Sequence, residues 1–182
     1  MATYNYQLEE HDYHTHLLYT ISKSSNANKV RANIRLLMTI SFLLFAFIAY
    51  GNGSKNQMVY FIFLAIVSFI VMPFYTRWSY KKAYLKHVRL YYKDRMSEPT
   101  SITFNDRTFS ISDNHGTSDL NTSEIEQINE IKDYYFLKLK SGQSIIIPLL
   151  KIENREVLSD ELHAISTALE IPLNNETNWI WK

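Results

Sequence analysis

Two long runs of apolar residues dominate the hydrophobic pattern of this chain. They cover residues 34–50 and 58–75, and Arg35, at the start of the first run, is the one charged residue in either. Each run approaches the roughly 20 residues that a helix needs to cross the hydrocarbon core of a bilayer. A polar bridge at residues 51–57 separates the two runs. The pattern therefore predicts a membrane α-helical hairpin of two spans over residues 34–75.

Residues 1–33, ahead of the hairpin, predict a strand followed by an amphipathic helix. Apolar side chains alternate through residues 4–8, as in a short strand. Asp12 is a residue type that caps helices. The apolar stripe of the following helix consists of Tyr13, Leu17 and Ile21. The pattern leaves open whether the strand joins a sheet made by the C-terminal half, which would make the folded domain discontinuous in sequence.

Residues 76–98 continue the helical pattern beyond the second apolar run. They contain no Gly or Pro, so we expect one long helix that leaves the membrane and ends at Pro99. Pro73 removes one backbone hydrogen bond and predicts a kink near the end of the second span. The basic stripe of this juxtamembrane helix consists of Lys82, Lys86, Arg89 and Lys93.

From residue 99 to residue 172 the period changes from that of a helix to that of strands. Apolar and polar residues alternate around turn signals at 105–106, 113–116 and 141–142, and one helix follows over residues 155–170. The predicted fold class is an α+β soluble domain, a pleckstrin-homology-like (PH-like) antiparallel half-barrel closed by one C-terminal helix. Residues 173–182 are expected to form a polar tail. The predicted core consists of Phe104, Phe109, Ile111, Leu137, Leu139, Ile146, Leu158, Leu162, Ile165 and Leu169.

Charge is distributed very unevenly along the chain. Between Tyr13 and Lys93 there are eleven Lys and Arg and no Asp or Glu, whereas the rest of the chain beyond Lys93 has eight Lys and Arg against fifteen Asp and Glu. Lysine and arginine flank the two apolar runs, and the bridge carries Lys55 alone. The positive-inside rule then predicts a multi-pass protein of the cytoplasmic (inner) membrane with both termini in the cytoplasm.

The basic stripe suggests contact with membrane lipid. Lysine and arginine next to a span attract anionic lipid head groups, so Lys82, Lys86, Arg89 and Lys93 are the candidate head-group residues. The stripe could instead serve only as the positive collar of the hairpin, or contact a protein partner. Aromatic neighbours would also suit a nucleic acid, but the setting beside a membrane span favours lipid, and no nucleic-acid partner is expected.

Motifs that would indicate chemistry are missing from the sequence. There is no Gly-x-Ser-x-Gly, phosphate-binding glycine loop, His-Glu-x-x-His or cysteine. His11 and His14 share a helix face and could in principle bind a metal, but surface or interfacial histidines are the simpler interpretation. A phosphoinositide site is disfavoured by the acidic charge beyond Lys93. We expect no enzyme activity, cofactor, metal or small-molecule substrate.

Several short motifs resemble the YcxB-like family of bacterial membrane proteins. The matching segments are residues 9–13, 122–125, 133–137 and 145–148, together with the two-span hairpin and its basic flanks. Thr122 stands where the family often has Trp, and Leu149 stands where it often has a basic residue. The resemblance implies a membrane-anchored domain with no assigned activity.

Two functions are consistent with these features. In the first, the hairpin holds a PH-like interaction domain at the cytoplasmic face of the membrane, where the domain docks an unknown protein or a second copy of the chain. In the second, the chain is an accessory subunit of a membrane transport or export complex, and the spans themselves carry the interaction.

Overall fold

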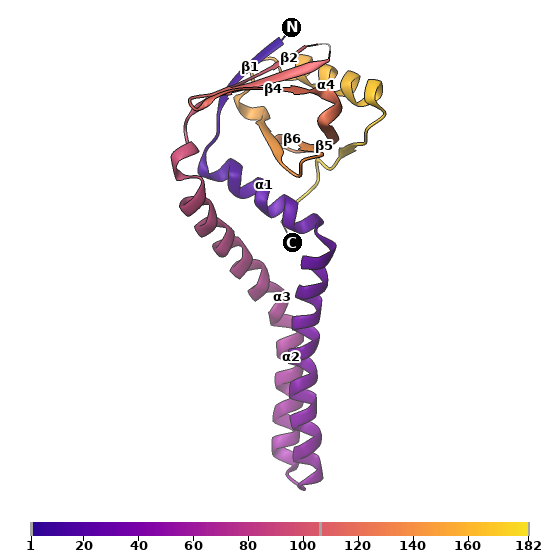
Figure 1. Cartoon of the computed structure of the whole chain (residues 1–182). Helices are drawn as coiled ribbons and strands as arrows, with labels where there is room; N and C mark the ends of the chain where they lie inside the picture. The colour runs from indigo at the N-terminus through magenta and orange to yellow at the C-terminus, as the bar shows by residue number, and fades with distance from the viewer. Residues whose placement is uncertain (1, 106, 182) are drawn as a thin grey trace. The chain divides into compact units, whose positions relative to one another are not determined.

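A computed structural model describes residues 2–105 and 107–181 (Figure 1). These residues contain four α-helices and two β-sheets, with three short 3₁₀ turns. The helices are α1 (Glu10–Lys23), α2 (Ser25–Gly51), α3 (Lys55–Tyr91) and α4 (Arg155–Leu169). The strands are β1 (Ala2–Gln7), β2 (Pro99–Phe104), β3 (Thr108–Asp113), β4 (Gly116–Asn121), β5 (Ile125–Ile131), β6 (Tyr134–Leu139), β7 (Ser144–Pro148) and β8 (Leu173–Asn175).

The chain divides into two compact units. Residues 17–86 with Trp181 form the hairpin unit, and residues 2–16 with 87–180 form the two-sheet unit. The two-sheet unit is therefore assembled from segments on both sides of the hairpin in the sequence. We describe each unit by itself.

Helix α2 and the first part of α3 run side by side within the hairpin unit (Figure 1). The hydroxyl of Ser24 caps α2 by accepting a hydrogen bond from the amide of Ala27 at 3.3 Å. The turn between the helices is shorter than the predicted bridge: the amide of Ser54 already bonds to the carbonyl of Ala49 at 3.0 Å. Gly53 permits this turn because its φ is +72°, a left-handed value that glycine adopts without strain.

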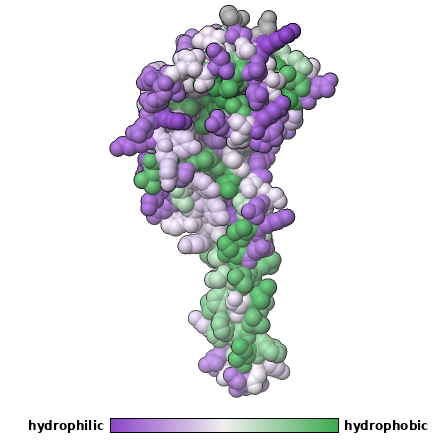
Figure 2. Space-filling view, viewed as in Figure 1, coloured by the Kyte–Doolittle hydropathy of each residue, from purple (hydrophilic) through white to green (hydrophobic). Residues whose placement is uncertain are grey.

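Small residues lie where the two helices meet. Ala46, Ala49 and Ala65 are each at most 4% exposed, and the rings of Phe45 and Phe61 approach to 5.6 Å between centroids. Small side chains allow helix backbones to approach closely, as in membrane helix pairs. Both helices are long and apolar enough to cross a membrane, and only 11% and 6% of their most apolar stretches are buried. Figure 2 shows the resulting hydrophobic surface over this part of the chain.

Helix α3 is one continuous helix of 37 residues with Pro73 inside it. The prediction that the second span and the juxtamembrane segment form a single helix is therefore confirmed, but the predicted end at Pro99 is wrong. The helix stops at Tyr91, and a 3₁₀ turn follows at Lys93–Arg95. The amide of Ser97, whose φ is +61°, donates to the carbonyl of Leu8 at 2.8 Å. That bond directs the backbone into the sheet before Pro99 is reached.

One sheet has the strand order β1-β2-β3-β4 and is antiparallel throughout. Strand β1 pairs with β2 over its whole length, with Tyr4 opposite Ile102. The N-terminal strand thus joins the sheet of the C-terminal half, which settles the question that the sequence left open. The predicted turn at residues 105–106 includes Asp106, which lies outside the described residues. The predicted hairpin at residues 113–116 joins β3 to β4.

The second sheet has the order β7-β6-β5-β8. Ile125, Ile128 and Ile131 are all buried on β5, and its pairing with β6 shifts register between Ile125 and Gln127, as at a β-bulge. Strand β8 pairs in parallel with β5, where the sequence predicted a polar tail from residue 173. The segment forms a strand because the edge of β5 offers unpaired backbone groups to it.

Helix α4 contacts both sheets of the two-sheet unit. The hydroxyl of Tyr4 in β1 donates to the Glu161 carboxylate at 3.0 Å, and the hydroxyls of Tyr135 in β6 and Ser159 are 3.1 Å apart. The buried members of the predicted core are Phe104, Phe109, Leu137, Leu139, Ile146, Leu158 and Leu162. The half-buried members are Ile111, Ile165 and Leu169. Ile165 and Leu169 are less buried than predicted because they border an open hollow of about 410 Å³.

Candidate functional site

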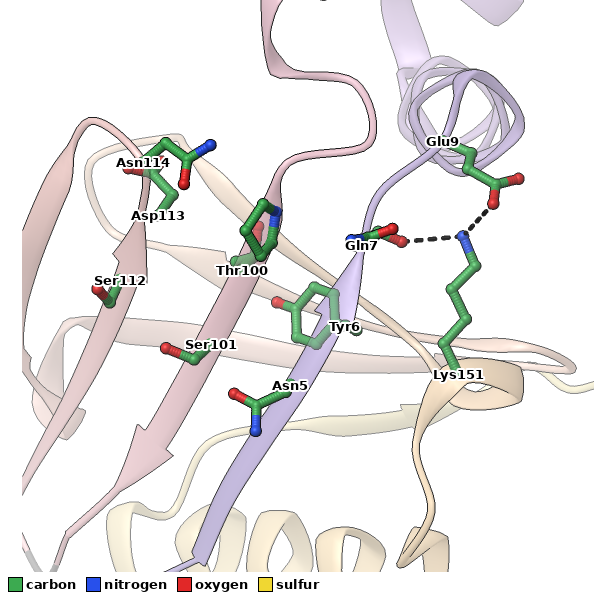
Figure 3. Close-up of a pocket in the computed structure, with 11 residues that line it drawn as sticks. Asn5, Tyr6, Gln7, Glu9, Thr100, Ser101, Ser112, Asp113, Asn114 and Lys151 are labelled. Carbon is green, nitrogen blue, oxygen red and sulfur yellow. Dashed lines mark hydrogen bonds and ion pairs between the residues drawn. The ribbon is translucent and has the colours of Figure 1, made fainter.

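An open groove of about 670 Å³ lies on the two-sheet unit, across β1, β2 and β3 (Figure 3). The middle of the groove is formed by Asn5, Ser101 and Ser112, which face one another across three neighbouring strands. One rim is the turn after β3, at Asp113 and Asn114. The other rim includes Glu9 and Lys151, and the remaining lining residues are Tyr6, Gln7, Pro99 and Thr100.

The groove belongs to a face of the sheet that carries short polar side chains. Side chains alternate between the faces of a strand, and the core residues Tyr4, Ile102 and Phe109 define the inner face. The residues of the opposite face are Thr3, Asn5, Gln7, Pro99, Ser101, Thr103, Thr108, Ser110, Ser112, Thr117, Asp119 and Asn121. Among the described residues of this outer sheet face, Asp119 alone is charged.

Hydroxyl pairs cross-link neighbouring strands on the outer sheet face. The hydroxyls of Thr3 and Thr103 lie 2.9 Å apart, and Thr117 donates to Ser112 at 3.0 Å. Ser110 donates to the Asp119 carboxylate at 2.5 Å. These bonds hold the face in place, so that little side-chain freedom remains to be lost when something binds there.

The rim at β3 is a tight turn organised by one carboxylate. Asp113 accepts hydrogen bonds from the amides of His115 at 2.8 Å and Gly116 at 3.1 Å. The ring Nε2 of His115 lies 3.3 Å from the Glu98 carboxylate. Asp113 thus fixes the turn by a side-chain bond to the backbone, which is the usual role of Asp in turns.

The opposite rim is organised by Lys151, which ends the 3₁₀ turn after β7. Its Nζ donates to the carbonyl of Gln7 at 2.9 Å and to Asp12 Oδ2 at 2.9 Å, and it lies 3.3 Å from Glu9 Oε1. Two of these contacts are visible in Figure 3 as dashed lines. Lys151 therefore connects the strand–helix segment at the N-terminus to the C-terminal sheet.

Asp12 is 4% exposed and is surrounded by donors. Besides Lys151, it accepts hydrogen bonds from the Tyr134 hydroxyl at 2.7 Å and from the amide of Glu9 at 2.8 Å. Burial, followed by the hydrogen bond to Asp12, raises the pKa of Tyr134 above its usual value. Asp12 is the third residue of α1 rather than the cap that precedes it, and it still satisfies the backbone by bonding to the amide of Glu9.

The three N-terminal histidines do not converge. His11 is exposed, His14 is 5% exposed and therefore not a surface residue, and the ring of His16 meets the edge of Phe136 with 5.0 Å between centroids. Burial lowers the pKa of His16 from 6.5 to about 4. Within residues 2–105 and 107–181, no group of three or more His, Asp or Glu side chains is arranged to hold a metal ion.

The four basic residues predicted to contact lipid occupy different settings. Lys82 and Lys86 are exposed on α3, and Lys82 lies over the ring of Trp78 at 5.1 Å. Arg89 forms a two-pronged ion pair with Glu10, at 2.8 and 2.9 Å, which lowers the pKa of that carboxyl. Lys93 lies beyond α3 in the 3₁₀ turn, so the expected helical stripe does not extend to it.

Sequence reasoning did not identify the Asp12–Tyr134–Lys151 cluster. Asp12 is 122 positions from Tyr134 and 139 positions from Lys151. No local spacing links residues so far apart, and each has an ordinary explanation in its own segment. The groove was missed for the same reason, because β1 and β2 are separated by the hairpin.

Two long apolar helices and a two-sheet α+β unit define the class of this protein. It is a protein with a candidate membrane hairpin and a folded polar unit. Within the two-sheet unit, residues 104–159, from the end of β2 into α4, match the family model described as YcxB-like protein. This match confirms the resemblance seen in the sequence and includes three of its motifs, whereas residues 9–13 lie outside it. No curated protein and no solved structure matched the chain.

Proposed function

We propose that this protein is a membrane-anchored docking protein: its hairpin crosses the cytoplasmic membrane, and its PH-like two-sheet unit binds another protein on the cytoplasmic side. The observation that carries the proposal is the polar groove on the outer sheet face. The proposal needs an anchor, a fold that presents the groove, and a surface suited to a protein partner.

The anchor is supported by the exposure of the hairpin helices. Phe47 and Phe74 are 74% and 68% exposed, and many other large apolar side chains of α2 and α3 are exposed as well. Leaving so much apolar area in water is unfavourable by about 25 cal/mol for each Å², whereas a bilayer core receives it. The basic flanks and the single Lys55 near the turn support placing both termini in the cytoplasm.

The PH-like assignment is supported by the order of the elements in the two-sheet unit. Four antiparallel strands (β1–β4) precede three antiparallel strands (β5–β7), and one helix, α4, follows them. This is the order of a PH-like half-barrel. The membrane hairpin then lies in the connection between the first and second strands, and β8 is an addition to the second sheet.

The outer sheet face suits a protein partner because it is depleted of charge. The chain beyond Lys93 contains 23 charged residues, yet on this face only Asp119 is charged among the described residues. Depletion of charge distinguishes the core of protein interfaces from other surface. Serine, threonine and asparagine also offer hydrogen bonds without the entropy that long side chains lose. Contact of Lys82, Lys86, Arg89 and Lys93 with lipid head groups stays a prediction beside this role.

Affinity capture of the full-length protein from native membranes after crosslinking tests the proposal. Ser101 lies at the centre of the groove and is half-buried, so Ser101→Arg introduces a long charged side chain there. Thr167→Arg adds the same side chain at an exposed position on α4 and is the matched control. We expect the first substitution to abolish capture of the partner and the second to leave it unchanged.

A third variant separates docking by the groove from association through the spans. In it, residues 34–75 are replaced by an unrelated membrane hairpin. Capture that survives this exchange and is lost in Ser101→Arg supports the docking role. Capture that survives Ser101→Arg and is lost in the exchange contradicts it and favours an accessory subunit of a membrane complex.

A further inference from the structure

A cleft of about 250 Å³ lies within the hairpin unit, between α2 and α3. Its polar lining residues are Asn28, Arg31, Arg35, Thr76 and Arg77, and its apolar ones are Ala32, Met72 and Pro73. The cleft is distinct from the groove on the outer sheet face and contains none of the basic residues singled out in the sequence for lipid contact. Its combination of three guanidinium groups with apolar side chains calls for a ligand of matching chemistry.

The cleft contains no carboxylate to neutralise its three arginines. No Asp or Glu occurs between Tyr13 and Lys93, so neither helix supplies one. The Nε of Arg35 is buried and has no hydrogen-bond partner among the described residues. A buried donor without a partner is unfavourable, so this group calls for a partner such as a water or an ion. An anion would satisfy this donor and also balance the charge of the three arginines.

Aromatic rings hold the guanidinium groups in position. Arg31 lies over the rings of Trp181 and Tyr80, at 5.1 and 5.6 Å from their centroids, and Arg35 lies over Phe69 at 4.7 Å. Arg31 also donates to the side-chain oxygen of Asn28. Rings and an amide orient these cations without cancelling their charge. Arg31 and Arg35 are thus arranged before any anion arrives.

The distance of the cleft from the helix turn matches the thickness of a bilayer core. At 1.5 Å per residue, Arg31 and Arg35 are roughly 30 and 24 Å along α2 from its end at Gly51. Arg77 is roughly 33 Å along α3 from Lys55 by the same measure. The hydrocarbon core is about 30 Å thick. When the turn lies at one surface, Arg31 and Arg77 lie at the level of the head groups on the other, where lipid phosphates are found. Arg35 starts about 6 Å deeper (30 − 24 Å), and a long arginine side chain near the end of a span extends toward the interface.

We propose that this cleft binds the phosphate of an anionic phospholipid head group, with Arg31, Arg35 and Arg77 as its ligands. Arginine pairs with phosphate through two parallel hydrogen bonds, and basic clefts between spans on the cytoplasmic side suit anionic head groups. Ala32, Met72 and Pro73 provide apolar contact for the lipid beside its phosphate. The inference rests on the membrane placement in the proposed function but does not require the groove to bind a protein.

Native mass spectrometry of the full-length protein in detergent micelles tests this site. The micelles are titrated with phosphatidylglycerol, with phosphatidylcholine, or with inorganic phosphate. Arg35→Gln is expected to weaken retention of phosphatidylglycerol about tenfold, which is the size of one charge-assisted hydrogen bond. Lys29→Gln removes the same charge at an exposed position of α2 and should change retention less than about twofold.

The outcomes distinguish lipid phosphate from free phosphate, and failure of the lipid site from failure of the membrane anchor. Equal retention of both phospholipids, equal retention by Arg35→Gln and the unsubstituted protein, or displacement by inorganic phosphate at matched concentration would each overturn the proposal. Arg35→Lys keeps the charge but not the two-pronged bond, so its retention of phosphatidylglycerol should fall between that of Arg35→Gln and that of the unsubstituted protein. It replaces Arg35→Gln in the test if that variant misfolds. Resistance of the protein to carbonate extraction is measured separately, so that failure of the anchor is not mistaken for failure of the lipid site.

Discussion

Replacing Lys151 by Met is the sharpest test of how the two-sheet unit is held together. Methionine keeps most of the aliphatic stem and removes the ammonium group that bonds to Asp12 at 2.9 Å. Asp12 is 5% exposed in its side chain and would keep its bonds from Tyr134 and Glu9 but lose its counter-charge. The substitution thus leaves a buried carboxylate uncompensated.

The expected loss is about 3 kcal/mol in the free energy of unfolding. Removing one partner of a buried ion pair costs about 3–5 kcal/mol. The Lys151 side chain is 29% exposed, so water reaches the site and the lower end of the range applies. A loss of this size is a large fraction of the roughly 5–15 kcal/mol that stabilises a typical domain.

Lys138→Met is the matched control. Lys138 lies 2.9 Å from Glu126, the same distance as in the Lys151 pair, but its two side chains are 40% and 45% exposed. Exposed pairs contribute less than about 1 kcal/mol. The dependence of protease resistance on urea, measured on the full-length protein in detergent, gives the loss in the free energy of unfolding for both variants. Equal losses in the two variants would refute the argument, because distance alone would then decide the effect.

Restoring charge balance in the Lys151 variant provides a second check. Asp12→Asn in the same chain removes the negative charge. Its one side-chain oxygen can accept from the Glu9 amide, which bonds to Oδ2 of Asp12, and its amide nitrogen can donate to the Tyr134 hydroxyl, which bonds to Oδ1. We expect the double variant to be more stable than Lys151→Met alone, since neutral groups replace the unpaired ion. A double variant less stable than the single one would contradict the argument, because the Asp12 carboxylate would then stabilise the fold even without its counter-charge.

Three further predictions concern the same unit. Because the pKa of His16 is about 4 in the folded chain and 6.5 is its ordinary value, the unfolded chain binds the proton first as pH falls. The contribution of neutral His16 to the free energy of unfolding is then fully present above about pH 6.5 and decreases by up to roughly 3 kcal/mol toward pH 4. His16→Phe should flatten the dependence of stability on pH, and an unchanged dependence would contradict the lowered pKa of His16. Leu162→Asp places a carboxylate where the leucine is 0% exposed and should remove protease resistance. Leu150→Asp, at a residue that is 65% exposed, should not. Equal resistance of the two variants would refute the placement of Leu162 in the core. Deleting residues 2–7 removes β1 and exposes the edge of β2, so the remaining chain should lose amide-exchange protection in β2, and retained protection would show that β1 is dispensable.

The elements of this protein follow from local patterns in its sequence. The apolar runs at residues 34–50 and 58–75 predicted α2 and the first part of α3, and the stripe on residues 155–170 predicted α4. Such features depend on neighbours a few residues apart, for which periodicity of side chains along one helix or strand is sufficient.

The sites of this protein follow from its tertiary structure. The groove exists because β1 pairs with β2 across the whole hairpin, and its rim exists because Lys151 meets Asp12 from 139 positions away. The arginine cleft likewise needs α2 and α3 side by side, although the absence of acidic residues around it is visible in the sequence. Composition and period determined the elements, whereas long-range strand pairing and buried charge determined which distant residues meet, because those interactions leave no regular spacing along the chain.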